Sequence, residues 1–346
     1  MLSKTIRVHH PGPAENMKWE KVEVSDPSAG QIQVKHSYIG LNYIDTYHRS
    51  GLYPLPLPAT IGMEAAGEVL KVGADTKFSE GDKVVYALGP PGSYSDVRNI
   101  PANKVVKLPE NIDEKSAAAI MLKGMTVEYL TERTFPINKD HVVLFHAAAG
   151  GVGQIATQWI KDKGAKIIGT VGNSEKAKIA KKNGCDEIIL YNENNFKEKV
   201  MDITNDQGVN VVYDGVGKNT AMQSLECLSA LGMLVIFGNS SGNAPPIDPS
   251  LLASKGSLFL TRPTLMTYNA SESDLNKSAN RVFQMLENKV ISPNIGNIYD
   301  LSEIVEVHKA LENRETKGSI ILKNNYWFIA SKKSLLFLED FNFSKR

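Results

Sequence analysis

One short segment constrains the fold of this chain more than any other. Residues 141–160 read HVVLFHAAAGGVGQIATQWI, a β-branched apolar run followed by small residues and then by an apolar-patterned helix. Ala148, Gly150 and Gly153 fill the positions of a G-x-G-x-x-G fingerprint, with alanine in place of the first glycine. Such a turn lets the main chain and a helix N-terminus approach a pyrophosphate. The pattern predicts a dinucleotide site, and the alternative is a glycine turn that serves packing alone.

The chain after this segment alternates strands and helices. Strand-like runs such as KIIGTV, EIILY, VNVVYDGVG, MLVIFG and SLFLTR are separated by helical segments as far as residue 262. One of these helices is expected over residues 219–232, NTAMQSLECLSALG. Regular βα alternation predicts an α/β fold with a doubly wound parallel sheet.

The first part of the chain has a different texture. Residues 5–108 contain short β-branched runs between Gly, Pro and Asp, which is typical of a β-rich, partly barrel-like domain. A length of 346 residues with 42% hydrophobic content favours two domains. We expect a β-rich catalytic domain over 1–125, completed by 263–323, a Rossmann domain over 126–262, and an extension over 324–346. For that extension a docked helix, an interface element and a disordered tail all remain open.

The charge balance argues against highly charged partners. Lys and Arg number 39 against 38 Asp and Glu, so no global field would hold the chain on nucleic acid or an anionic membrane. The N-terminus lacks the apolar core of a signal peptide, and no apolar run approaches the roughly 20 residues of a membrane span. Cys185 and Cys227 are isolated and suit reduced thiols. We expect a cytoplasmic protein with small-molecule partners.

The end of the second Rossmann strand bears on cofactor choice. NAD enzymes place an acidic residue there for the ribose 2′-hydroxyl. Here the stretch GTVGNSEKAK offers Gly172, Asn173, Ser174 and Lys176, which suit a 2′-phosphate, although Glu175 lies among them. These residues favour NADPH over NADH. The competing interpretation is that Ser174 and Lys176 only begin an exposed helix.

Co-linear stretches then carry a family resemblance. GLNYIDTYHRSGLYP, GMEAAGEVLKVG, LKGMTVEYL, LFHAAAGGVGQIATQWIK, VVYDGVG and FGNSSG occur in order over nearly all of residues 4–323. In these stretches the chain resembles the medium-chain dehydrogenase/reductase superfamily and, within it, NADPH:quinone oxidoreductases of the zeta-crystallin type. The resemblance implies a GroES-like catalytic domain, a Rossmann domain and a homodimer joined through edge strands of the Rossmann sheets.

Zinc-dependent alcohol dehydrogenases share that architecture. Asn42 and Met63 stand where the resemblance would place the Cys and His ligands of a catalytic zinc, and no cysteine precedes Cys185. We therefore expect no metal. A quinone accepts hydride or electrons readily, so holding it against the nicotinamide supplies much of the rate. His48 and Glu64 remain as isolated potential ligands.

The resemblance implies a set of site residues. It places Asn42, Asp45, Tyr47 and Tyr53 in catalytic positions, with Tyr53 meeting the acceptor. The residues expected to contact NADPH are Asn42, Tyr43, Ile44, Asp45, Thr46, Tyr47, Tyr129, Gly150, Gly151, Val152, Gly153, Gly172, Asn173, Ser174, Lys176, Tyr191, Gly215, Val216, Phe237, Gly238, Asn239, Ser240 and Arg314.

Several of these assignments have alternatives. Each tyrosine can instead pack with its hydroxyl satisfied locally, Asp45 can serve as a turn or cap residue, and Arg314 can be a surface charge. Gly215 departs from the serine of many relatives. For the whole protein the leading hypothesis is an NADPH-dependent quinone reductase. The alternatives are reduction of enones or reactive aldehydes, and a dinucleotide-binding structural or RNA-binding protein.

Overall fold

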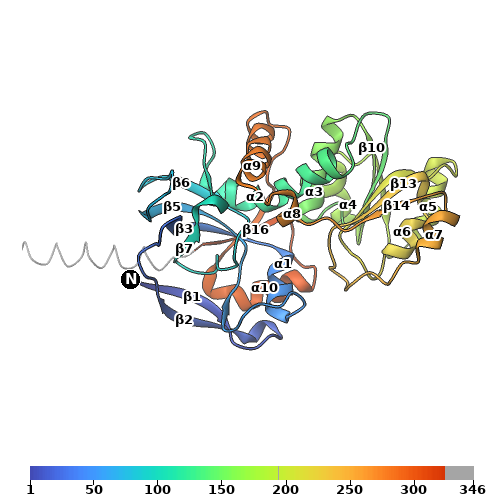
Figure 1. Ribbon diagram of the computed structural model, residues 1–346. Helices are drawn as coiled ribbons and strands as arrows, with labels where there is room; N and C mark the ends of the chain where they lie inside the picture. The colour runs from blue at the N-terminus through green and yellow to red at the C-terminus, as the bar shows by residue number, and fades with distance from the viewer. Residues whose placement is uncertain (194, 324–346) are drawn as a thin grey trace, which may run out of the picture.

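The computed structural model describes residues 1–193 and 195–323, so the predicted extension lies outside the described residues. Figure 1 shows a β-rich unit on one side and a parallel-sheet unit on the other, with α2 (Glu114–Glu128) and α9 (Glu272–Glu287) between them. Within the described residues, no helix combines the length and the apolar character that crossing a membrane requires.

The β-rich unit contains two sheets. A three-stranded sheet has the order β2-β1-β4, and a larger mixed sheet has the order β15-β16-β3-β5-β6-β8, with β7 also paired to β3. Residues from distant parts of the sequence therefore meet in one sheet. The strands are β1 (Leu2–Val8), β2 (Met17–Glu23), β3 (Gln31–Leu41), β4 (Ala59–Thr60), β5 (Glu64–Val72), β6 (Lys83–Tyr86), β7 (Val97–Pro101), β8 (Val106–Lys107), β15 (Ile295–Asp300) and β16 (Ser319–Lys323).

Two helices close one end of this unit. α1 (Tyr43–Ser50) and α10 (Ile304–Glu312) lie side by side, and the buried guanidinium of Arg49 makes two hydrogen bonds to the Glu312 carboxylate at 2.6 and 2.9 Å. Such paired, charge-assisted bonds fix geometry as well as adding energy. The remaining short helical turns of the unit are η1 (Ala14–Asn16), η2 (Ala102–Lys104) and η4 (Leu301–Glu303).

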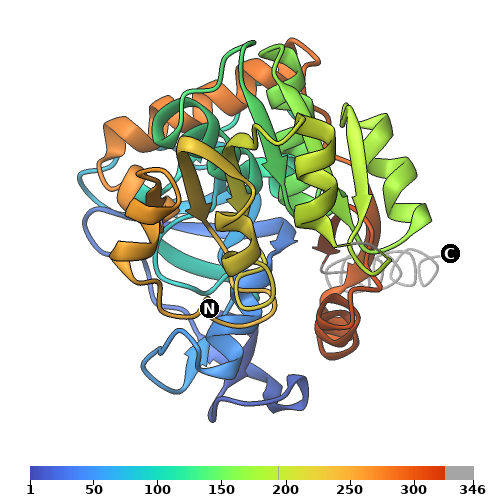
Figure 2. The ribbon, with the colours of Figure 1, turned by 90° about the vertical axis from the view of Figure 1, so that its right-hand side faces the viewer.

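The second unit is a six-stranded parallel sheet with the order β11-β10-β9-β12-β13-β14. This is the doubly wound Rossmann order, and it confirms the predicted parallel sheet. Helices flank the sheet, as Figure 2 shows. Its elements are β9 (Val142–Phe145), α3 (Gly151–Asp162), β10 (Lys166–Val171), α4 (Ser174–Lys182), β11 (Glu187–Leu190), α5 (Phe196–Thr204), β12 (Val209–Asp214), α6 (Ala221–Leu225), β13 (Leu228–Ile236), α7 (Pro249–Ser254) and β14 (Phe259–Thr261).

The two units share a core through α2. This helix packs on β3, β5 and β6 of one sheet and on α3 and α9 beside the other. Gly124 permits the contact with α9, because a Cβ at that position would lie 2.8 Å from Val282 Cγ1. A π-helical turn, η3 (Tyr129–Thr134), continues α2 toward β9, and the short α8 (Leu265–Tyr268) precedes α9.

One predicted element is wrong. The helix expected over residues 219–232 is only α6, which ends at Leu225, and β13 already begins at Leu228. Leu231 has φ of +61°, a left-handed conformation that a right-handed helix excludes. Its side chain is exposed, while Leu228 is buried and pairs with Val209 of β12. Sheet pairing therefore overrides the local helical pattern.

Candidate functional site

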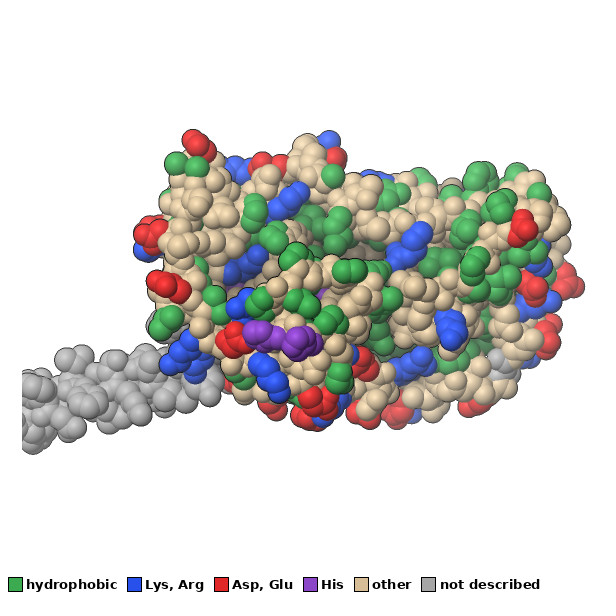
Figure 3. All heavy atoms as spheres, turned by 60° about the horizontal axis from the view of Figure 1, so that its bottom comes forward, with side chains coloured by type: hydrophobic (Ala, Val, Ile, Leu, Met, Phe, Trp, Pro, Cys, Tyr) green, Lys and Arg blue, Asp and Glu red, His purple; other side chains and the backbone are tan. Residues whose placement is uncertain are grey.

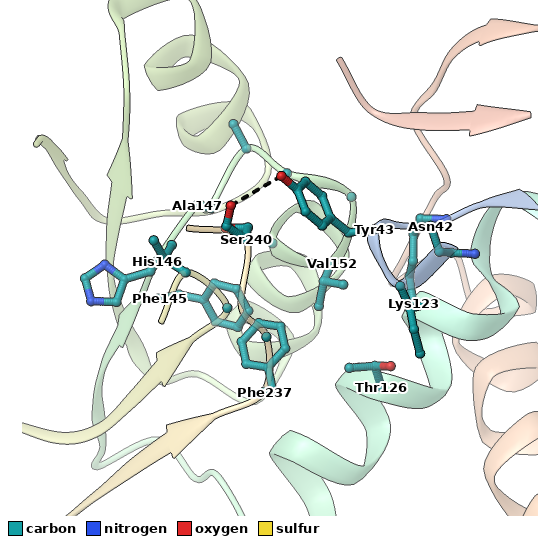
Figure 4. Close-up of a pocket in the computed structure, with 18 of the residues that line it drawn as sticks. Asn42, Tyr43, Lys123, Thr126, Phe145, His146, Ala147, Val152, Phe237 and Ser240 are labelled. Carbon is teal, nitrogen blue, oxygen red and sulfur yellow. Dashed lines mark hydrogen bonds between the residues drawn. The ribbon is translucent and has the colours of Figure 1, made fainter. Parts of the chain in front are cut away.

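A cavity of about 940 Å³ lies between the two units. It opens at the carboxyl ends of β9, β10 and β12, where the strand order reverses and doubly wound folds bind their ligands. Figure 4 shows side chains from α1, from α2 and from the loops after β9 and β13 facing this space. Both units therefore contribute to one site.

The glycine turn after β9 forms the floor of the cavity. Gly153 has no room for a side chain, since a Cβ there would lie 2.4 Å from the Ala147 carbonyl oxygen. This close approach brings the first turn of α3 against the end of β9. Gly150 is the N-cap and makes no side-chain cap bond, so the helix N-terminus keeps free N–H donors. Such a terminus suits a phosphate.

A cationic cluster lies at the end of β10. Lys176 Nζ donates to the Arg314 carbonyl oxygen at 2.9 Å, and Arg314 Nη1 donates to the Tyr191 hydroxyl at 3.3 Å. Partial burial, followed by the charges of Arg314 and Lys317, lowers the pKa of Lys176. Glu175 is exposed, forms an ion pair with Lys317 at 3.3 Å and is not among the residues that line the cavity. The cluster is suited to a phosphate dianion.

Two residues of α1 that were predicted at the cofactor do not line the cavity. Asp45 is fully buried, and its carboxylate accepts bonds from the Asn42 backbone N–H at 2.9 Å and from the Tyr94 hydroxyl at 3.0 Å. Thr46 is also buried and donates to the Tyr43 carbonyl at 2.7 Å. Asp45 is thus a cap residue of α1, the alternative that the sequence left open, because the helix turns its N3 side chain inward.

The tyrosines instead reach across the cavity. Tyr43 donates to the Ser240 carbonyl at 3.3 Å (Figure 4), and the Tyr47 hydroxyl accepts from the Asn239 backbone N–H at 3.0 Å. The Tyr53 hydroxyl accepts from Arg262 Nη2 at 3.1 Å and from Asn239 Nδ2 at 3.4 Å. Within the described residues it donates to no protein group. Tyr53 therefore retains a proton with which to meet a ligand.

The predicted residues divide into two groups. Those that line the cavity are Asn42, Tyr43, Ile44, Tyr47, Tyr53, Tyr129, Gly150, Gly151, Val152, Gly153, Gly172, Lys176, Tyr191, Gly215, Val216, Phe237, Gly238, Ser240 and Arg314. Those that do not line it are Asp45, Thr46, Asn173, Ser174 and Asn239. Asn173 caps α4, since its side chain accepts from the Lys176 backbone N–H at 2.9 Å.

The sequence did not predict two basic residues that line the cavity, Lys123 and Arg262. Lys123 of α2 is only 5% exposed, and its Nζ lies 3.5 Å from Glu64 Oε2 without a hydrogen-bond partner among the described residues. Glu64 itself accepts from Asn42 Nδ2 at 2.7 Å. Arg262 also lines the cavity, where it lies beside Tyr53. A lysine amid the apolar residues of LKGMTVEYL was the available signal for Lys123.

A buried polar cluster supports the loop after β12. Asp214 Oδ1 accepts from the backbone N–H of Val216 at 2.8 Å and from that of Gly217 at 3.0 Å. Its other oxygen accepts from Ser224, which also contacts His146 Nε2 at 2.9 Å. Within residues 1–193 and 195–323, no group of three or more His, Cys, Asp and Glu side chains is arranged to hold a metal ion.

A GroES-like unit and a Rossmann unit with a shared cavity define the class of medium-chain dehydrogenases/reductases. Residues 28–110 match the family model described as alcohol dehydrogenase GroES-like domain, and residues 151–284 match that of zinc-binding dehydrogenase. The resemblance in the sequence is thereby confirmed, as is the fold class.

Comparison with individual proteins identifies the family within this class. The chain is 42% identical over 323 residues to a quinone oxidoreductase of Pseudomonas aeruginosa, covering 93% of this chain and 99% of that protein. It is 40% identical to a 2-haloacrylate reductase of a Burkholderia species, covering 91% and 97%. The solved structure of Escherichia coli quinone oxidoreductase complexed with NADPH has a TM-score of 0.90 at 44% identity, covering 92% and 99%. This chain belongs to the quinone oxidoreductase family.

The buried cap generates a prediction on stability. Burial, the largest cause, raises the pKa of Asp45 from 3.8 to about 7. The native state thus holds this proton more tightly than the unfolded state, so the stability that it contributes is lost as the pH rises toward 7. Asp45→Asn removes this titration. We therefore expect the free energy of unfolding of the variant, relative to that of wild type, to be higher at pH 8 than at pH 5.

Urea unfolding at both pH values measures this difference. Asp248→Asn, at the exposed cap of α7, is the matched control, because the pKa of Asp248 is lowered and the group is ionised throughout that interval. An identical pH dependence in wild type and Asp45→Asn would contradict the assignment of a buried, proton-holding cap.

Proposed function

We propose that this protein is an NADPH-dependent quinone reductase. The observation that carries the proposal is the continuity of one cavity from the Lys176–Arg314 cluster, past the bare helix N-terminus at Gly150, to the tyrosines around Tyr53. That sequence of groups matches a phosphorylated ribose, a diphosphate and a nicotinamide facing an acceptor. The relatives named as quinone oxidoreductases, and the NADPH complex of one of them, support it.

The chain's own residues suit this cofactor. Lys176 and Arg314 would hold the 2′-phosphate, and the α3 N-terminus at Gly151 and Val152 would hold the diphosphate. Asn42, fixed by its bond to Glu64, would orient the nicotinamide end. When bound, NADPH supplies a hydride. Asp45 and Thr46 would not contact the cofactor, and would affect the nicotinamide end only by stabilising α1, which positions Tyr43 and Tyr47.

The acceptor end differs from that of a zinc enzyme at two ligand positions. Asn42 and Met63 line it where a zinc enzyme would carry Cys and His. A quinone needs little activation, so positioning between aromatic walls suffices for much of the rate. Tyr53 would donate a hydrogen bond to the acceptor oxygen, and one proton from water, together with the hydride from NADPH, completes the hydroquinone.

A second acceptor class has specific support. One relative, 40% identical, is named 2-haloacrylate reductase, which is an activated-alkene reductase by name. The same cavity would hold an enone or related alkene. The third hypothesis, a structural or RNA-binding role, has less support, because basic and acidic side chains are interspersed over the face in Figure 3 rather than gathered by sign.

Two organisational features belong to the same proposal. We infer a division into residues 1–125 with 263–323 as the catalytic domain and 126–262 as the Rossmann domain. We also infer a homodimer through β14, which pairs with β13 on one side only and leaves Phe259 and Leu260 54% and 38% exposed. A cytoplasmic location remains a prediction.

Steady-state kinetics with NADPH test the activity. We expect 1,4-benzoquinone and 1,4-naphthoquinone to be reduced with a higher kcat/KM than a simple α,β-unsaturated ketone, because quinones accept hydride without a strong electrophilic catalyst. A higher kcat/KM for the ketone would replace the quinone assignment by that of an enone reductase. Tight NADPH binding without turnover of any of them would favour a binding role.

Lys176→Ala tests the cofactor preference. Loss of an ion pair to the 2′-phosphate is expected to raise the Kd for NADPH about tenfold or more while changing the Kd for NADH less than about twofold. Cofactor fluorescence titration measures both constants. Lys178→Ala, an exposed lysine on the same helix, is the control. Equal weakening of NADPH and NADH by Lys176→Ala would refute the phosphate contact.

Phe259→Glu tests the homodimer. A charge on the free edge strand should prevent two sheets from pairing, so sedimentation velocity is expected to show a dimer for wild type and a monomer for the variant. Met222→Glu places the same charge at a similarly exposed apolar residue on α6 and should leave the dimer intact. A monomeric wild type, or a dimer in both variants, would exclude this interface.

A further inference from the structure

The charge of the cavity lining is strongly one-sided. Its basic side chains are those of Lys123, Lys176, Arg262 and Arg314, and none of the lining residues is an aspartate or a glutamate. A concave site with a single sign of charge concentrates ligands of the opposite sign. NADPH accounts for part of this, since it carries a diphosphate and a 2′-phosphate.

Two of the four cations lie where a cofactor phosphate is expected, and a third, Lys123, forms an ion pair with buried Glu64 at 3.5 Å. Lys176 and Arg314 form the cluster at the end of β10. The Lys123 stem lies against the helix N-terminus, with Cε 3.0 Å from where a Gly151 Cβ would stand. Arg262 comes from the loop after β14 and lies instead beside Tyr53, at the acceptor end.

Arg262 retains an uncompensated charge there. Its Nη1 donates to the Pro263 carbonyl at 3.1 Å and its Nη2 to the Tyr53 hydroxyl at 3.1 Å, while no carboxylate of the described chain forms an ion pair with it. Most N–H donors of the guanidinium fork stay free. Burial raises the pKa of Tyr47 and of Tyr129, and the Arg262 charge opposes the rise in both, so its field reaches the cavity interior.

We propose that Arg262 and Tyr53 form an anion subsite that selects acceptors bearing a carboxylate next to the electrophilic double bond. The substrate class is an α,β-unsaturated carboxylate or a carboxylated quinone, which a planar guanidinium binds with two parallel hydrogen bonds. The assignment rests on the proposed reductase function and names a preference within it.

The carboxylate takes no part in the bond changes. The acceptor's electrophilic carbon gains the hydride that NADPH loses, its partner atom gains a proton from water, and the two electrons remain in the reduced product. Arg262 acts by holding the negative group while the double bond lies over the nicotinamide position near Asn42 and Tyr47.

A matched pair of acceptors isolates this role. An unsaturated acid, 2-chloroacrylate, is compared with its methyl ester and with neutral 1,4-benzoquinone, each with NADPH. For Arg262→Gln, kcat/KM for the acid is expected to fall about 10- to 100-fold, chiefly through KM, while the ester and the quinone change less than about twofold. Comparing variants cancels the different intrinsic reactivities of acid and ester. The kcat/KM of Arg262→Lys for the acid should lie between those of wild type and Arg262→Gln, because an ammonium group keeps the positive charge but cannot make two parallel hydrogen bonds.

Two controls separate local from general effects. Lys218→Gln removes a cation from the loop after β12 that does not line the cavity, and it should leave the acid-to-ester ratio unchanged. Tyr53→Phe should weaken all three acceptors. An equal loss for acid and ester in Arg262→Gln would overturn the anion subsite and assign Arg262 to positioning Tyr53.

Binding of the acid to the NADP⁺-loaded protein, which cannot reduce it, is measured by calorimetry and distinguishes the subsite from the proposed function. A wild type that reduces benzoquinone but neither binds nor reduces the acid would contradict the subsite and leave quinone reduction standing. A wild type that binds the acid in an Arg262-dependent way but reduces no acceptor would contradict the reductase function and support the subsite.

Discussion

The close approach of Gly153 to the end of β9 is the constraint on which the rest of the site depends. A Cβ at Gly153 would lie 2.4 Å from the Ala147 carbonyl oxygen, so only glycine lets α3 start so near the strand. The helix N-terminus then opens at the edge of the sheet where the strand order reverses. Main-chain donors, rather than side chains, face the cavity at that point.

The second unit completes the cavity that the proposed reductase function requires. α2 packs on both units, and the tyrosines of α1 bind the backbone of residues 239 and 240 across the gap. These long-range contacts fix the distance between the cofactor end and the acceptor end. Pre-organisation of that kind is how an enzyme without a strong electrophile obtains much of its rate.

The placement of charge follows the same division. Asp45 and Glu64 are fully buried and do not line the cavity. The Asp45 side chain accepts a hydrogen bond from the Asn42 backbone N–H, and Glu64 accepts one from the Asn42 side chain and forms an ion pair with Lys123. The cations face the cavity. Negative charge is thereby withheld from a space that must receive a polyanionic cofactor, and a cationic surplus remains at the acceptor end.

The sequence by itself determined the fold class, the glycine turn and the basic residues Lys176 and Arg314 that line one end of the cavity, because these depend on local spacing and on co-linear motifs. Only the tertiary structure decided which neighbours of a motif face the cavity: one turn of α1 directs Tyr43 and Tyr47 into it and Asp45 away from it. It also decided that β13 begins at Leu228, through pairing with β12. Arg262 meets Tyr53 across 209 residues of sequence, and no local pattern encodes a contact that packing alone creates.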